Sequence, residues 1–252
     1  MILTWLYLPP FLRLLAHSRL CCTNYAGHVI PTSAGLILSF TTTFTVALAL
    51  LWNRYPPHQA AGFIIVVNGF ALVGLLDDVV GGKGTKGWRG HLRTLRFGRL
   101  STGMIKVLYG GALALAVASA KTVALWDLIL NASLIALGAA LFNQLDVRPA
   151  RATVTFVSAS FLLGWGGGWT LLSSIAPLVG AALVYLPFDK KGHAMLGDSG
   201  ANALGAAWGW AAGGLPYGHK WSLLLLALAF HVVGEGYSLQ GLTDRILRRK
   251  QG

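Results

Sequence analysis

The chain has 252 residues, of which 55% are hydrophobic and only 11% are charged, and its mean hydropathy is +0.62. Because a globular domain in water carries about 25% charged residues, this composition excludes a soluble enzyme, a disordered chain and a secreted disulfide scaffold. The only two cysteines, Cys21 and Cys22, are adjacent and cannot build a disulfide framework. The remaining class is an integral membrane protein, with a formal net charge of +12.

Runs with no charge, or with only one, predict the membrane helices. Residues 1–12 are apolar but contain Pro9 and Pro10, and they lack the basic start and cleavage site of a signal peptide, so we expect a short or re-entrant helix. The longer runs follow in chain order: 33–52, 60–76, 102–120, 122–142, 152–188, 199–219 and 221–234. The run 152–188 is too long for one span, and the glycines at 166–168 predict that it forms a helical hairpin.

These runs predict an all-α, polytopic transmembrane helical bundle with about eight to nine spans. We expect one membrane domain over 1–252, with an N-terminal stub at 1–32, the bundle at 33–237 and a basic cytoplasmic tail at 238–252. Several spans are short, which favours tilted or closely packed helices. Glycines that permit close helix contact recur in them, at Gly110, Gly111, Gly138, Gly205 and Gly209.

The charges predict how the bundle is oriented. If 33–52 runs outward from the cytoplasm, all but three of the 20 Lys and Arg residues fall on the inner side, the exceptions being Arg54, Lys121 and Lys220. This positive-inside pattern indicates a multi-pass membrane protein with a cytoplasmic C-terminus. It also explains the basic residues without a nucleic-acid partner.

The acidic residues predict a site on the same inner side. Asp127 is the only one of the eight Asp and Glu residues that falls outside. Several of the others lie at span ends, where a carboxylate is costly unless it is paired or binds a cation. Carboxylates on one membrane face, among basic loops, indicate a site for a metal and a phosphate-bearing substrate.

Asp77 and Asp78 end the run 60–76, where the partial negative charge of a helix C-terminus disfavours two carboxylates without a cation. Adjacent helical residues point about 100° apart, so one could approach a metal while the other faces a lipid phosphate. A polar stop at the membrane surface is an equally good interpretation of this pair alone.

A loop rich in glycine and basic residues follows the Asp pair. It contains Lys83, Lys86 and His91, whose cations or ring nitrogens suit phosphate oxygens. The alternative is a loop that attracts anionic headgroups. Lys106, one turn into the next run, either completes a phosphate site or extends to the headgroups.

Two further motifs carry polar side chains. Asn143 and Asp146 are three residues apart at the end of a span, so they share a helical face and could hydrogen-bond a nucleobase or ribose; a capped helix end is the alternative. Asp198 precedes the run 199–219 and is either a further carboxylate for Mg²⁺ or a helix N-cap. His231 and Glu235 share a face of the last span and either line the same cavity or pair with each other.

In this order the motifs resemble those of the polyprenyl-phosphate N-acetylhexosamine-1-phosphate transferases (glycosyltransferase family 4), a superfamily that includes the phospho-N-acetylmuramoyl-pentapeptide transferase and UDP-GlcNAc:undecaprenyl-phosphate GlcNAc-1-phosphate transferases. The resemblance covers residues 24–237. It rests on Asn24-Tyr25-Ala26-Gly27 with Pro31-Thr32 and Gly35, on Asp77-Asp78, on Asn143 with Asp146, and on Met195-Leu196-Gly197-Asp198-Ser199-Gly200.

The resemblance implies a Mg²⁺-dependent enzyme of the bacterial plasma membrane, with Mn²⁺ as an alternative ion, whose catalytic loops lie in the cytoplasm. It would transfer a sugar-1-phosphate from a UDP-sugar, such as UDP-GlcNAc or a UDP-MurNAc-peptide, to undecaprenyl phosphate and release UMP, in cell-envelope glycan synthesis such as that of peptidoglycan or teichoic acid. The implied catalytic residues are Asp77, Asp78 and Lys106, and the implied metal ligands are Asp198 and Asp77. The implied substrate-binding residues are Asn24, Lys83, Lys86, His91, Asn143, Asp146 and Asn202.

Two other interpretations stay open. The family's His-rich loop is missing, which is compatible with an inactive relative that binds a lipid-linked precursor or scaffolds an envelope complex. A transporter would need acids near the membrane midplane and internal repeats, and the sequence shows neither. A homodimer is compatible with the sequence.

Overall fold

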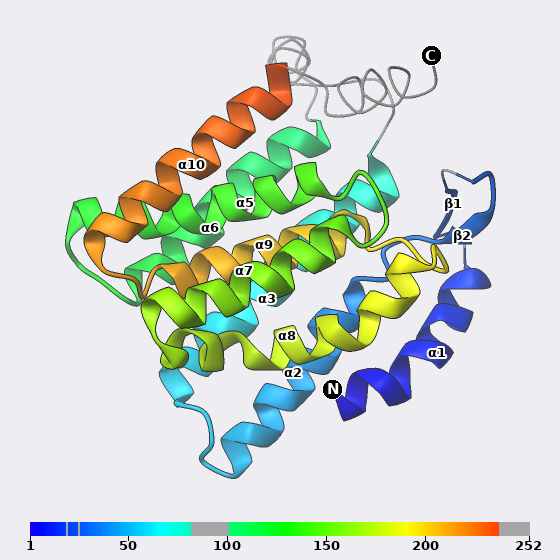
Figure 1. Cartoon of the computed structure of the whole chain (residues 1–252), viewed down its shortest axis with the longest axis horizontal. Helices are drawn as coiled ribbons and strands as arrows, with labels where there is room; N and C mark the ends of the chain where they lie inside the picture. The colour runs from blue at the N-terminus through cyan, green and yellow to red at the C-terminus, as the bar shows by residue number, and fades with distance from the viewer. Residues whose placement is uncertain (19, 25, 82–100, 237–252) are drawn as a thin grey trace.

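The computed structural model describes residues 1–18, 20–24, 26–81 and 101–236 (Figure 1). The described part contains nine α-helices and one short antiparallel hairpin, so the all-α prediction is confirmed. The elements are α1 (Ile2–Ala16), β1 (Cys21–Thr23), β2 (Val29–Pro31), α2 (Leu36–Leu51), α3 (Pro57–Val80), α5 (Thr102–Ser119), α6 (Leu125–Leu145), α7 (Arg151–Gly167), α8 (Trp169–Lys190), α9 (Gly197–Ala212) and α10 (Tyr217–Gly236).

Every predicted run contains a helix, and the run 152–188 is a hairpin, as predicted. Gly168 separates α7 from α8 and has φ +96°, a conformation that a residue with a Cβ rarely adopts. The N-terminal segment forms the helix α1, which continues through Pro9 and Pro10.

The prediction of eight to nine spans is wrong, because only four described helices are long and apolar enough to cross a membrane: α3, α5, α6 and α8. Uncharged runs overstate helix length, since they include turns. The run 199–219, for example, contains α9, which ends at Ala212 and so is only about 24 Å long, against about 30 Å of hydrocarbon. The four long helices indicate a multi-pass membrane protein.

Helix α9 lies at the centre of the bundle, packed most extensively against α3 and α6. Nearly all of its residues are buried, and its small side chains let the neighbouring backbones approach. A Cβ on Gly205 would overlap the carbonyl of Gly138, and one on Gly209 would overlap that of Leu134. The predicted close contacts are therefore present at these glycines, whereas at Gly111 no atom of the described part of the chain lies within 4 Å of the position of a Cβ.

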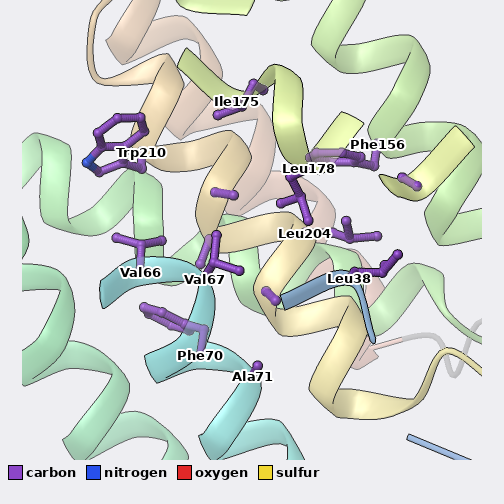
Figure 2. Packing of buried hydrophobic residues seen from close by; sticks show 14 of the residues in the cluster. Leu38, Val66, Val67, Phe70, Ala71, Phe156, Ile175, Leu178, Leu204 and Trp210 are labelled. Carbon is purple, nitrogen blue, oxygen red and sulfur yellow. The ribbon is translucent and has the colours of Figure 1, made fainter. Parts of the chain in front are cut away.

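Apolar side chains of α9 pack together with those of four surrounding helices. Figure 2 shows Leu38, Val67, Phe156, Leu178 and Leu204, all of them fully buried, from α2, α3, α7, α8 and α9 respectively. Because lipid tails are as apolar as these side chains, close packing rather than water exclusion holds the helices together where they face lipid.

The bundle has two chemically different ends. The connections α2–α3, α5–α6, α7–α8 and α9–α10 are short and gather at one end, on the left and lower side of Figure 1, which we call the four-loop end. There Lys220 forms an ion pair with Asp127 (2.8 Å), and the Lys121 ammonium contacts both the carbonyl (3.0 Å) and the ring (3.7 Å) of Trp210. The opposite end carries the β1–β2 hairpin, and we call it the hairpin end.

Candidate functional site

Three charged side chains from three helices meet at the hairpin end. The Lys106 ammonium of α5 contacts the carboxylates of Asp77 in α3, at 2.8 Å, and of Asp198 in α9. The last turn of α3 and the first turns of α5 and α9 lie at this end because the chain reverses between successive helices. We call Asp77, Lys106 and Asp198 the charged triad; each of the three side chains is between 19 and 31% exposed.

Asn143 of α6 joins the triad through its carboxamide. Its amide nitrogen donates to Asp198 Oδ1 (2.8 Å), and its oxygen accepts from Lys106 Nζ (3.3 Å). The cation and both ends of the amide therefore hold the Asp198 carboxylate and Lys106 in one arrangement. Four helices contribute to this site, so its geometry depends on how the bundle packs.

Asp78 forms hydrogen bonds with the start of α9 rather than with Lys106. Its carboxylate accepts the Ser33 hydroxyl (2.8 Å) and the backbone N–H groups of Asp198 (3.0 Å) and Ser199 (3.2 Å). These N–H groups have no partner within a helix, and a carboxylate is favoured at a helix N-terminus. The two adjacent aspartates thus serve different partners, as their helical spacing predicts.

Asp198 does not have the alternative role of helix N-cap that the sequence allowed. Asp198 lies inside the first turn and is not the N-cap, because α9 begins at Gly197 and Leu196 occupies the cap position. The capping group comes from Asp78, 120 residues away in sequence. Sequence analysis did not identify Ser33, and nothing in its sequence context pointed to it.

A cavity of about 1100 Å³ opens beside the triad. Its polar part is lined by the triad with Asp78, Asn143 and Asn202, so it collects six of the predicted site residues. Its apolar part extends along α3, α5 and α6 to Phe70, Gly110 and Ala136. Phe70 and Ala136 lie about two helical turns from Asp77 and Asn143, so the cavity runs from a charged end into the apolar interior of the bundle.

His231 of α10 also lines this cavity, and its Nδ1 is 2.7 Å from the amide nitrogen of Gln144. This contact ties α10 to the end of α6. Of the predicted pair His231 and Glu235, the structure describes the side chain of His231 but only the backbone of Glu235.

A second, smaller pocket of about 100 Å³ holds the predicted residues Asn24 and Asp146, with Arg148 and Asp189. The structure does not bring Asp146 and Asn143 into one cavity: Asp146, the C-cap residue of α6, lines this pocket, and Asn143 lines the larger one. Burial, and after it the neighbouring carboxylate of Asp189, raises the pKa of Asp146 well above its usual value, while the backbone N–H of Gly197 favours the charged form. Asp189 is itself buried and accepts the Thr153 hydroxyl (2.6 Å).

The three remaining predicted site residues, Lys83, Lys86 and His91, lie outside the described residues.

The charged triad offers oxygen ligands that suit a hard cation. Among the described residues, no group of three or more His, Cys, Asp or Glu side chains is arranged to hold a metal ion. Mg²⁺, however, commonly takes one or two carboxylates and completes its shell with water and substrate phosphates. Asp77 and Asp198 therefore fit a Mg²⁺ site that a phosphate-bearing substrate completes.

No family model matches the chain, and no curated protein matches it. The class that the structure defines is a multi-pass helical membrane protein with a charged cavity at one end of its bundle.

Proposed function

We propose that the chain is a phosphoglycosyl transferase of the bacterial plasma membrane, with its hairpin end in the cytoplasm. It moves a sugar-1-phosphate from a UDP-sugar to a polyprenyl phosphate and releases UMP, for cell-envelope glycan synthesis. The observation that carries the proposal is the charged triad at the mouth of a cavity whose deeper part is apolar. A lipid phosphate needs both environments, one for its headgroup and one for its tail.

The chemistry requires charge neutralisation more than proton transfer. An oxygen of the acceptor phosphate forms a bond to the phosphorus that carries the sugar, and the bond from this phosphorus to the bridging oxygen breaks, so the electron pair leaves with UMP. The attacking oxygen is already anionic, so the protein has to align two phosphates and offset their repulsion. Lys106 supplies a fixed positive charge at this position.

Each residue of the site has a role in this proposal. Asp77 and Asp198 would hold Mg²⁺, which supplies Lewis-acid stabilisation of the phosphate charge when bound. Asn143 keeps Asp198 and Lys106 in register through its two hydrogen bonds. Asp78 is a positioning residue, because it acts on the backbone of Asp198.

The second pocket is the candidate for donor recognition. Asn24 and Asp146 lie there beside Arg148, and carboxamide, carboxylate and guanidinium groups can hydrogen-bond a nucleoside. The pocket and the triad both border the segment that leads into α9, since Leu196 lines the pocket and Asp198 belongs to the triad. A donor bound across this segment would have its pyrophosphate near Lys106.

The test is UMP release by the full chain in liposomes that contain undecaprenyl phosphate, with Mg²⁺ and UDP-GlcNAc or a UDP-MurNAc-peptide. We expect turnover by the wild type and its loss in Asp198→Asn and Lys106→Gln. Lys190→Gln is the matched control, because Lys190 is an exposed lysine at the same end of the bundle and lines neither pocket.

Other outcomes separate the alternatives. Full activity of Asp198→Asn would overturn the metal assignment. Retention of undecaprenyl phosphate by the wild type without UMP release from any UDP-sugar would favour the non-catalytic lipid-binding relative.

A further inference from the structure

Exposed tryptophans gather at the four-loop end of the bundle. Five of the nine tryptophans of the chain lie there, between 40 and 86% exposed: Trp52, Trp126, Trp165, Trp169 and Trp221. They follow α2, begin α6, flank Gly168 between α7 and α8, and lie near the start of α10. We call these five residues the aromatic belt.

The belt has the chemistry of a lipid interface. An indole ring is mostly apolar but carries one N–H donor, so it is favoured where acyl chains meet headgroups and water. Between the belt and the hairpin end, the exposed side chains of the helices are mostly apolar, for example Leu72, Leu115, Val154 and Leu226. Lipid tails on one side and water on the other therefore match the surroundings of the belt.

The hairpin end is different. Its exposed charged residues include Arg13, Arg148, Lys190 and Lys191, and such side chains bind lipid phosphates. Within the described ranges, the one exposed tryptophan outside the belt is Trp5 on α1. The two ends thus carry the two kinds of residue that mark membrane interfaces, aromatic at one end and basic at the other.

Helix length connects the two ends. Helix α3 begins at Pro57 beside the belt and reaches the triad at Asp77. At 1.5 Å per residue this segment rises about 30 Å, which equals the hydrocarbon thickness of a typical bilayer, also about 30 Å.

We propose that the aromatic belt seats the four-loop end in one lipid interface and thereby places the charged triad at the level of the lipid phosphates of the opposite leaflet. The partner of the belt is the acyl–headgroup boundary of a phospholipid bilayer. At this depth a phosphate reaches Lys106 without leaving the headgroup layer, while an attached chain stays in the hydrocarbon. The placement does not depend on catalysis, since a protein that only binds a lipid phosphate would be seated in the same way.

The test measures depth at three positions of the full chain. In a Cys21→Ser, Cys22→Ser background, single cysteines replace Trp165 in the belt, Leu226 midway along α10, and Val80 one turn beyond Asp77. All three positions are more than half exposed. Each variant is spin-labelled in vesicles of phosphatidylethanolamine and phosphatidylglycerol, and depth is read from collision with oxygen and with a water-soluble nickel complex. Trp126→Cys is a second belt variant in case Trp165→Cys does not fold.

We expect shallow depths for the labels at 165 and 80 and the greatest depth for the label at 226. A membrane-impermeant maleimide added outside the vesicles shows which face each cysteine occupies, and the fractions labelled at 165 and at 80 should be complementary. A label at 80 as deep as that at 226, or equal labelling patterns at 80 and 165, would overturn the placement. The depth measurement does not depend on UMP release. A failure of the membrane placement can therefore be told apart from a failure of the proposed function.

Discussion

The side chain of Asp78 holds the main chain of Asp198, since its carboxylate accepts the Asp198 N–H at 3.0 Å. Through this bond Asp78 fixes the start of α9, the helix that carries Asp198. The position of the Asp198 carboxylate against Lys106 therefore depends on a residue that does not itself touch Lys106 in an ion pair.

This relationship predicts the effect of Asp78→Ala. The variant leaves the N–H groups of Asp198 and Ser199 and the Ser33 hydroxyl without their acceptor. Loss of a helix cap costs about 0.5–2 kcal/mol, so we expect a lower Tm in detergent together with reduced UMP release. Asp78→Asn keeps one acceptor oxygen and should lie between the wild type and Asp78→Ala in both measurements. Equal Tm values for all three proteins would show that Asp78 does not hold α9.

Lys106→Gln tests the charge balance of the triad. Without the ammonium, no cation among the described residues lies between the carboxylates of Asp77 and Asp198, so they should attract an added divalent ion more strongly. We expect Mn²⁺ affinity to rise about tenfold, measured by electron paramagnetic resonance, while turnover falls by about 10²–10³, the usual effect of removing one preorganised stabilising group. Lys190→Gln should change neither quantity. Weaker Mn²⁺ binding by Lys106→Gln would mean that the two carboxylates do not share an ion.

The glycine contacts between α6 and α9 predict the cost of a single methyl group. A Cβ on Gly205 would overlap the backbone carbonyl of Gly138, which cannot rotate away. Overpacking of this kind costs about 1–3 kcal/mol, so Gly205→Ala should lower Tm and displace α9. Gly218→Ala is the matched control, because no atom of the described residues lies within 4 Å of its Cβ position. A Tm for Gly205→Ala as high as that of the control would contradict the close packing.

Asp146 predicts a pH dependence of stability. Burial, with the charges of Asp189, Asp198 and Asp78, raises its pKa in the folded protein, while the backbone N–H of Gly197 opposes this shift. Arg148 lines the same pocket. A carboxyl whose pKa is raised on folding is least destabilising below its unfolded pKa, and stability is lost as the pH rises towards the folded pKa. Asp146→Asn resembles the protonated form at every pH. The Tm of this variant should therefore exceed that of the wild type by a margin that grows from pH 4 to pH 8, and a constant margin would show that Asp146 stays charged.

Much of the fold follows from the sequence because it is a local property. An uncharged run in a membrane has to pair its backbone groups internally, so a helix forms in each run whatever its neighbours are. The break between α7 and α8 at Gly168 is also a local property, because a glycine adopts a positive φ more readily than other residues. The spans were over-counted because absence of charge does not set where a helix ends, as α9 shows by stopping at Ala212.

The composition and order of the chain determined the membrane class, the helical elements and the gathering of acids near one end. Only the tertiary structure decided which side chains meet: Lys106 meets Asp198, and Asp78 meets Ser33. It also decided that Asn143 and Asp146 line different pockets. The partners are separated by 92 residues in the first of these contacts and by 45 in the second. Contacts over such separations depend on how closely the helices approach at small residues such as Gly205. The distance between two helices is a property of the packed bundle rather than of any one segment.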